Sequence, residues 1–169
     1  MQNYLSRHSR TILLKEVGYE GSLAISASKI LLIGAGGLSS SIISILASSG
    51  VAELMVWEPD ILELSNLQRQ FIYKSTDVSK QKVLLAQSFT GELNPDVKFT
   101  AISKKLCDET FLEFLECVNK VDVVVDGTDS FSSRVLANKA CVSLNKPFFT
   151  GSCIGFGAPI AILPLPSGP

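Results

Sequence analysis

The sequence predicts an α/β fold: a doubly wound, mainly parallel, Rossmann-like sheet with helices on both faces. Three observations predict it. Short apolar runs of strand length alternate with segments whose apolar residues recur at helical spacing. A glycine-rich turn follows the first apolar run and precedes a helical segment. Acidic residues stand at or after the ends of two further predicted strands, where open α/β sheets bind ligands.

The bulk composition limits the classes of protein. With 169 residues, the chain is near the size of one domain, and we expect residues 1–169 to form a single domain. It is 46% hydrophobic and 18% charged, enough for a sizeable core. A net charge of −1 without a dense Lys/Arg stripe argues against a nucleic-acid partner. The longest near-apolar segment, Leu38–Leu46, is too short to cross a bilayer, and we expect a cytoplasmic protein without membrane contact.

The first strand and the turn after it carry the strongest signal. Ile30–Ile33 is an apolar run that suits one buried parallel strand. Gly34, Gly36 and Gly37 follow it, and glycines let a backbone turn sharply and a ligand approach closely. Helical spacing resumes over 38–46. The free N–H groups at the start of that helix would suit a phosphate.

The next strand ends in a candidate ribose ligand. Residues 51–58 predict a strand whose last residue, Glu58, stands 22 residues after Gly36, where a carboxylate commonly meets a ribose hydroxyl. A solvated acid at a strand end is the alternative. Ser39 stands where the dinucleotide fingerprint has Gly or Ala, and it is still small enough for close packing of helix on strand.

The polar segment that follows favours a triphosphate over a redox dinucleotide. Its apolar residues predict a short helix packed against the core, with Asn66, Arg69 and Gln70 projecting from another side. The planar fork of an arginine suits phosphate oxygens. The apolar residues that predict this helix are Leu64, Leu67 and Phe71.

Lys82 is a second candidate for an anionic ligand. It lies near the start of a helix predicted over 79–93, where a lysine opposes the helix dipole. An ordinary surface lysine is the alternative.

Two acids follow a further buried strand, which the three valines at 123–125 predict. Asp126 and Asp129 would emerge at its carboxyl end, and carboxylates facing a phosphate would need a cation such as Mg²⁺ between them. The alternative is that Asp129 or Ser130 caps the helix predicted over 131–144.

The other segments complete the alternation. Arg7 and Arg10 share one side of a possible helical turn, and we expect the only histidine, His8, to be a surface residue without a role. Gly18 and Gly21 should break this region. The four cysteines form no Cys-x-x-Cys pair and are expected to be small buried residues. The remaining predictions are helices over 22–28 and 109–118 and strands over 97–102, 146–151 and 158–163.

The residues alone indicate a nucleotide-binding α/β domain, with ATP favoured over NAD. Beyond that, several stretches resemble the ThiF/MoeB/HesA family, the bacterial relatives of ubiquitin-activating enzymes. The run Gly151–Gly157 is more similar to ThiF than to MoeB. The stretches that carry the resemblance are RHSRTILL (7–14), GAGGL (34–38), LSNLQRQ (64–70), Lys82 and DGTDS (126–130).

This resemblance implies an ATP-dependent adenylyltransferase. Such an enzyme activates the C-terminal glycine carboxylate of a ubiquitin-like sulfur-carrier protein, here a ThiS-like carrier of thiamine thiazole biosynthesis. A MoaD-type carrier of molybdopterin biosynthesis, a truncated non-catalytic nucleotide-binding domain and, least favoured, an NAD-dependent oxidoreductase domain are the alternatives. The cofactors implied are ATP and Mg²⁺, and the partners are the carrier and a second copy in a homodimer.

The resemblance also assigns roles to residues. Arg10 would reach the site of the partner subunit, and Glu58, where the family usually has Asp, would hold the ribose. Asp129 would organise Mg²⁺, beside Ser130 where the family usually has Asn. Zinc is expected for the full-length family, but its Cys-x-x-Cys ligands are absent here, so the chain resembles a C-terminally truncated member. The other expected nucleotide contacts are Gly34, Gly36, Gly37, Ser65, Asn66, Arg69 and Lys82.

Overall fold

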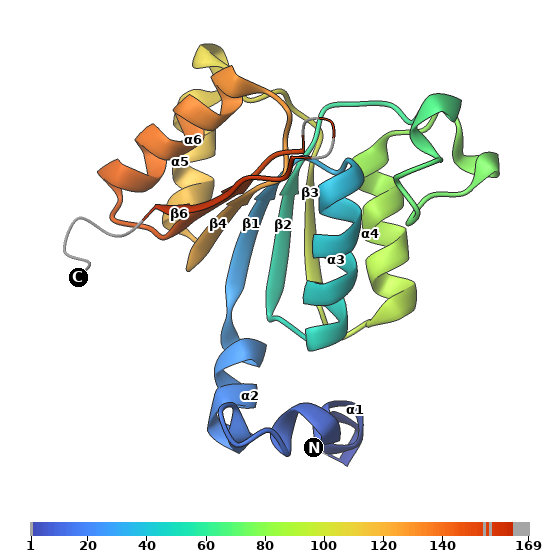
Figure 1. Cartoon of the computed structure of the whole chain (residues 1–169), viewed down its shortest axis with the longest axis vertical. Coiled ribbons are helices and arrows are strands. Elements are labelled where there is room, and N and C mark those ends of the chain that lie inside the picture. The colour runs from blue at the N-terminus through green and yellow to red at the C-terminus, as the bar shows by residue number, and fades with distance from the viewer. Residues whose placement is uncertain (1, 154, 156, 164–169) are drawn as a thin grey trace.

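The fold is built on one six-stranded sheet in the strand order β3-β2-β1-β4-β5-β6 (Figure 1). The computed structural model describes residues 2–153, 155 and 157–163. The first five strands are parallel and β6 is antiparallel to β5, which confirms the predicted doubly wound, mainly parallel sheet. The strands are β1 (Lys29–Ile33), β2 (Glu53–Trp57), β3 (Lys98–Ile102), β4 (Val123–Asp126), β5 (Phe148–Gly151) and β6 (Ile160–Leu163).

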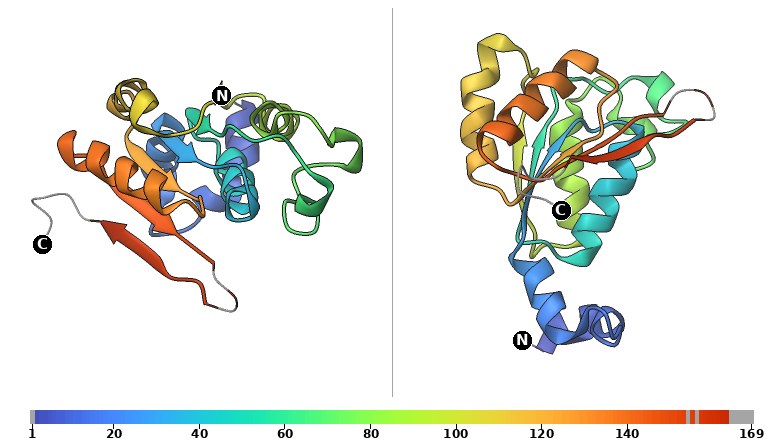
Figure 2. Two further views of the ribbon diagram at one scale, coloured as in Figure 1. Left: turned by 90° about the horizontal axis from the view of Figure 1, so that it is seen from above. Right: turned by 60° about the vertical axis from the view of Figure 1, so that its left-hand side comes forward.

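Helices cover both faces of this sheet, as predicted. Helices α3 (Gly37–Ser49) and α4 (Lys82–Leu93) pack on one face, and α5 (Phe111–Asn119) and α6 (Phe131–Ser143) pack on the other (Figure 2). Two further helices, α1 (Gln2–Ile12) and α2 (Gly18–Ala27), lie beyond the amino ends of the strands. No helix in the described ranges is long and apolar enough to cross a membrane.

The apolar run of β1 is explained by burial from both sides. Ile30 and Leu32 pack with Ile43 of α3, whereas Leu31 and Ile33 face the helices on the opposite side. Side chains of a strand point alternately to the two faces, so a central strand covered on both faces needs an unbroken apolar run. The core therefore consists of two layers, one on each side of the sheet.

The short helix predicted from Leu64, Leu67 and Phe71 is wrong. Only one 3₁₀ turn forms, Leu64–Asn66, and Leu64 and Phe71 are 71% and 62% exposed. Only Leu67 packs against the core. The reason is local: the Glu63 N–H donates to Asn66 Oδ1, at 3.2 Å, and this side-chain bond closes a turn instead of continuing a helix.

The expected surface position of His8 is also wrong. His8 is buried under Gly50, the residue that ends α3 with φ +73°. A Cβ at Gly50 would lie 2.8 Å from the His8 ring, so glycine is needed there for its conformation and for space. Burial and then the charge of Arg7 lower the pKa of His8.

Two smaller expectations need correction, and a third lies in part outside the described residues. Gly18, with φ +62°, begins α2, but Gly21 lies within that helix and does not break it. Cys117 and Cys141 are buried as expected, whereas Cys107 is half-buried and Cys153 is exposed. Within the run 151–157, residues 154 and 156 lie outside the described residues, as does the Pro-rich end, 164–169.

Candidate nucleotide site

The glycine turn lies at the point where the strand order reverses direction. β1 is followed by β2 and β3 on one side and by β4 on the other. In open α/β sheets, ligands bind at such a reversal, beyond the carboxyl ends of the two central strands, here β1 and β4. Gly34 leaves β1 with φ +91°, and a Cβ there would lie 3.1 Å from Thr128 Cγ2 and 3.4 Å from the Gly127 carbonyl. Backbone conformation and close approach therefore both require glycine at 34.

The small side chain of Ser39 allows α3 to approach the loop after β4. Ser39 is fully buried in the first turn of α3. A Cβ at Gly127 would lie only 2.4 Å from Ser39 Oγ, so serine at 39 and glycine at 127 depend on each other. This confirms the expectation that Ser39 preserves close packing in the place of the usual glycine.

The side chain of Arg69 packs against the glycine turn. A Cβ at Gly37 would lie 3.4 Å from Arg69 Cγ, so the arginine stem crosses this residue at van der Waals distance. Arg69 Nη1 donates to the Ser65 carbonyl at 3.3 Å. Gln70 reaches the same turn, since its Nε2 would lie 3.7 Å from a Cβ on Gly36. Tertiary packing therefore unites two stretches that the sequence singled out separately.

Glu58 anchors the glycine turn from inside. Its Oε2 accepts the Ala35 N–H at 2.6 Å, and its Oε1 accepts the Asp60 N–H at 2.8 Å. The side chain is buried, and this desolvation raises the pKa of Glu58. Each carboxylate oxygen can accept a second hydrogen bond, so the ribose contact stays a prediction beside the anchoring role.

Lys82 carries a buried positive charge with weak compensation. It is the first residue of α4, and its side chain is only 7% exposed, which excludes an ordinary surface lysine. Among the described residues, the ammonium Nζ has one ion pair, 3.3 Å to Asp60 Oδ2, and the Asp60 side chain is itself largely exposed. The charge of Lys82 also acts on the buried Glu58, where it lowers the pKa of that carboxyl as the smallest of several causes. Burying an ammonium costs several kcal/mol unless partners compensate for its hydration. A strongly anionic ligand would supply that compensation.

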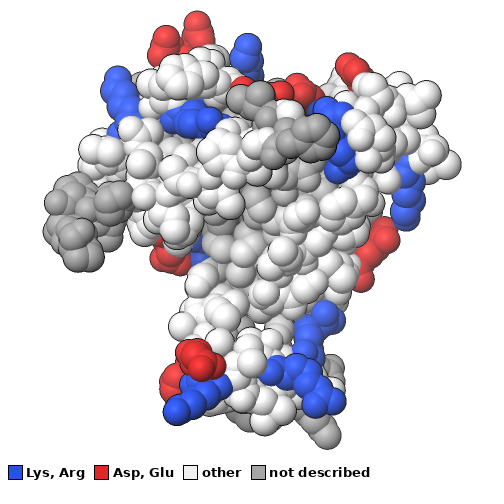
Figure 3. All heavy atoms as spheres, in the orientation of Figure 1, with Lys and Arg blue, Asp and Glu red and all other residues white. Residues whose placement is uncertain are grey.

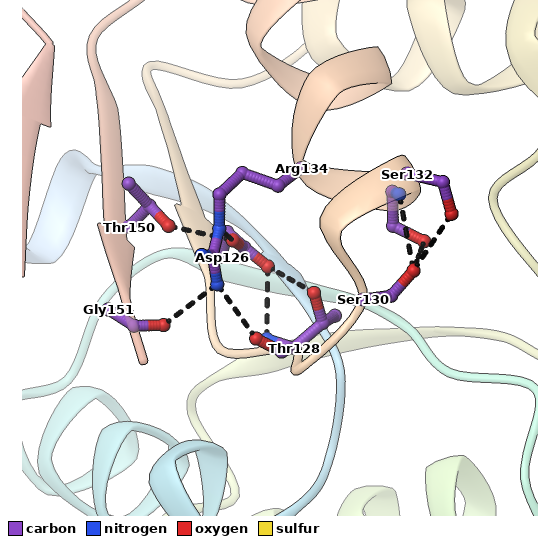
Figure 4. Close-up of polar contacts among 8 residues, drawn as sticks. Asp126, Thr128, Ser130, Ser132, Arg134, Thr150 and Gly151 are labelled. Carbon is purple, nitrogen blue, oxygen red and sulfur yellow. Dashed lines mark hydrogen bonds and ion pairs between the residues drawn. The ribbon is translucent and has the colours of Figure 1, made fainter. Parts of the chain in front are cut away.

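Asp126 is not a free ligand, which corrects the expectation that it faces a phosphate through a cation. Its Oδ1 accepts bonds from the Thr128 N–H at 2.9 Å and hydroxyl at 2.6 Å. Its Oδ2 accepts bonds from Arg134 Nε and Thr150 Oγ1, each at 2.7 Å. Arg134 Nη2 also donates to the carbonyls of Thr128 and Gly151 (Figure 4). Asp126 thus joins β4, β5 and α6.

Asp129 and Ser130 have different surroundings. Asp129 is exposed at the carboxyl edge and forms no ion pair with a described residue. Ser130 caps α6, because its Oγ accepts the Ser133 N–H at 3.3 Å. In the described part of the chain, no group of three or more His, Cys, Asp or Glu could hold a metal ion. A Mg²⁺ contact through Asp129 stays a prediction.

Ser65 and Asn66 shape the loop that carries Arg69. Ser65 Oγ donates to Glu63 Oε2 at 3.1 Å, and Asn66 Oδ1 accepts the Glu63 N–H. Arg10, in contrast, is not brought to this site. It lies on α1, at the amino end of the sheet and thus at the opposite end from the glycine turn.

Sequence reasoning missed Tyr73. Its buried hydroxyl donates to the Ala35 carbonyl at 2.8 Å, inside the glycine turn. No spacing rule indicates this contact, because 38 residues separate the two partners.

The strand order and the glycine turn at its point of reversal are those of a Rossmann-like domain. The model of the ThiF family matches residues 8–164, so the chain belongs to the ThiF family. This confirms the family resemblance drawn from the sequence motifs.

Two curated relatives and one solved structure illustrate the similarity. The chain is 38% identical over 160 residues to the sulfur carrier protein ThiS adenylyltransferase of Escherichia coli K12, covering 95% of this chain and 62% of that protein. It is 37% identical to a sulfur carrier protein adenylyltransferase of Thermus thermophilus, covering 96% and 59%. The chain therefore spans about three fifths of these relatives. The structure of E. coli MccB with MccA-N7isoASN shares the fold, with a TM-score of 0.85 at 24% identity, covering 95% and 48%.

Proposed function

We propose that residues 1–169 form one nucleotide-binding domain of an ATP-dependent adenylyltransferase. Its substrate would be the C-terminal glycine carboxylate of a ubiquitin-like sulfur carrier. The buried ammonium of Lys82, with one 3.3 Å ion pair to an exposed carboxylate, is the observation that carries the proposal. A polyphosphate is the chemical class that such a charge would bind. The E. coli relative is named for ThiS, which favours a ThiS-like carrier over a MoaD-type one.

The roles of the residues follow from charge and position. In this reaction the carrier carboxylate attacks the α-phosphate and pyrophosphate leaves, so two anions must be brought together. Lys82 and Arg69 would neutralise phosphate charge, and Gly34, Gly36 and Gly37 would let the nucleotide lie against the backbone. The loops around the nucleotide would contribute Ser65, Asn66 and Ser130, and Glu58 would bind the ribose.

Magnesium would enter this site with the nucleotide. Mg²⁺ is usually bound through one or two carboxylates together with substrate phosphates and water. One exposed carboxylate, Asp129, fits that donor set, whereas both oxygens of Asp126 are already engaged. When bound, the ion would neutralise phosphate charge.

Mg·ATP is expected to stabilise the chain against heat, whereas NAD is not. Binding to the native state at a hundredfold excess over Kd adds about 2.7 kcal/mol, which corresponds to roughly 5–10 °C in Tm for a chain of this size. Differential scanning fluorimetry with each ligand measures the shift, and calorimetric titration gives Kd. NAD binding more tightly than ATP would contradict the proposed nucleotide.

Pyrophosphate exchange tests the reaction itself. Incubation with Mg·ATP, labelled pyrophosphate and a purified ThiS-like carrier should return label to ATP, and omission of the carrier should abolish the return. A carrier lacking its terminal glycine is the matched control. ATP binding without exchange would reduce the proposal to a non-catalytic nucleotide-binding domain.

We further propose that the chain forms a homodimer through its α3 face. Phe148 faces α5 and α6, so its neighbour Phe149 faces the opposite side, and the β5–β6 register places Ile162 beside Phe149. Ile160 and Ile162 of β6 are exposed on this face, as is Ile45 of α3. Figure 3 shows a broad central area of this side without charged residues. A second copy would cover this apolar surface.

A dimer would also give Arg10 a role. Its helix lies at the amino end of its own sheet, so Arg10 could meet a nucleotide only in another chain. This supports a shared site.

Ile162→Lys is expected to convert the dimer into a monomer, because it places a charge on the apolar face. Leu112→Lys is the matched control: both side chains are exposed, at 62% and 74%, but Leu112 lies on α5, a helix of the opposite face. Sedimentation velocity would measure the mass of each variant. A wild-type monomer at micromolar concentration, or equal loss of dimer in both variants, would refute this interface.

A further inference from the structure

The peptide groups of Ala35 are held from two sides inside the glycine turn. The Ala35 N–H donates to Glu58 Oε2 at 2.6 Å, and the Ala35 carbonyl accepts the Tyr73 hydroxyl at 2.8 Å. Both side chains are buried, with exposed fractions of 5% and 6%. The turn is therefore fixed by two buried bonds from different segments of the chain.

The bond from Tyr73 sets the direction of the next amide. A trans peptide is planar, so the Ala35 carbonyl and the Gly36 N–H, which belong to one peptide group, point in opposite directions. Because Tyr73 holds the carbonyl on the buried side, the Gly36 N–H points away from Tyr73. No hydrogen bond joins this N–H to any described residue. It is an oriented donor at the N-terminus of α3, beside Arg69 on Gly37.

We propose that Tyr73 is a positioning residue, which aims the Gly36 N–H at a phosphate of the bound nucleotide. This inference rests on the proposed function. Tyr73 follows the loop that carries Arg69, and Arg69 contacts Gly37 while Tyr73 bonds to Ala35. One short segment therefore orients both the backbone donor and the guanidinium that face the same ligand. Preorganised donors of this kind bind developing or fixed charge without reorganisation.

The Tyr73 hydroxyl is suited to act as a permanent hydrogen-bond donor. Burial, and then the charge of Glu58, raise the pKa of Tyr73 above its ordinary value, so the hydroxyl keeps its proton at physiological pH. A phenylalanine would fill the same space and leave the Ala35 carbonyl without its partner.

Tyr73→Phe tests the proposal, with Tyr4→Phe as the matched control. Tyr4 also places its hydroxyl in a hydrogen bond, 2.7 Å from Ser22 Oγ, but at the amino end of the sheet. Calorimetry would measure Kd for Mg·ATP and for adenosine, and thermal melting would confirm folding. In Tyr73→Phe we expect Kd for Mg·ATP to rise about tenfold, the effect of one lost hydrogen bond, while Kd for adenosine stays within about twofold. Tyr4→Phe should change neither constant.

The comparison of Kd for Mg·ATP with Kd for adenosine distinguishes a loss of phosphate binding from a general loosening of the fold. Equal losses for both ligands in Tyr73→Phe would show that the fold had loosened, and would overturn the positioning role. An unchanged Kd for Mg·ATP in Tyr73→Phe, with normal binding by the wild type, would overturn this inference alone. Absence of ATP binding by the wild type would refute the proposed function and this inference with it.

Discussion

Replacement of Arg134 by alanine is expected to lower the free energy of unfolding by about 3 kcal/mol, because it leaves the buried carboxylate of Asp126 without its cationic partner. Asp126 would stay fully buried without its ion pair, and the carbonyls of Thr128 and Gly151 would each lose a donor. Arg134 is a quarter exposed, so water can replace part of the lost interaction. Urea denaturation followed by circular dichroism would measure the change.

Arg69→Ala is the matched control for Arg134→Ala. Arg69 is exposed and, within the described ranges, donates one 3.3 Å bond to a carbonyl, so its removal should barely change the unfolding free energy. It should instead weaken Mg·ATP binding by about 1.5–3 kcal/mol, the usual value of a hydrogen bond to a charged group. If Arg134→Ala left stability unchanged, the Asp126 network would not hold the carboxyl edge. An unchanged Kd for Mg·ATP in Arg69→Ala would show that the phosphates do not bind at Arg69.

Lys82→Met is expected to reduce pyrophosphate exchange by about 10²–10³-fold, the usual loss when one preorganised donor is removed from developing charge. Stability should change little, because methionine fills a similar volume and the described ion pair that is lost is long and goes to the exposed Asp60. A large loss of exchange without a large loss of stability would identify Lys82 as a ligand-binding group rather than a structural one.

Lys80→Met is the control for this second prediction. Lys80 lies two residues earlier, is 58% exposed and pairs with Asp77 on the surface. Its replacement should change neither exchange nor stability appreciably. Retained exchange in Lys82→Met, or a large loss of stability in that variant, would contradict the binding role. Chemical denaturation and the exchange assay on the same preparations would separate the two outcomes.

The sequence by itself determined the sheet and the glycine turn. The valines of 123–125 and the apolar run of β1 could be identified as strands because a sheet covered on both faces demands continuous apolar residues. The turn after β1 was visible for a similar reason, since few residues other than glycine tolerate the conformation and close contacts at Gly34. These requirements act over a short range, so each can be recognised from a few consecutive residues.

Only the tertiary structure decided which polar groups are free. Asp126 and Asp129 are three residues apart, and the sequence pattern does not distinguish their roles. In the structure, Arg134 of α6 and Thr150 of β5 donate hydrogen bonds to Asp126, whereas Asp129 is exposed. Burial of Lys82 and the bond from Tyr73 to Ala35 arise in the same way. A side chain's partners and desolvation depend on segments that arrive from elsewhere in the chain, and no local spacing encodes them.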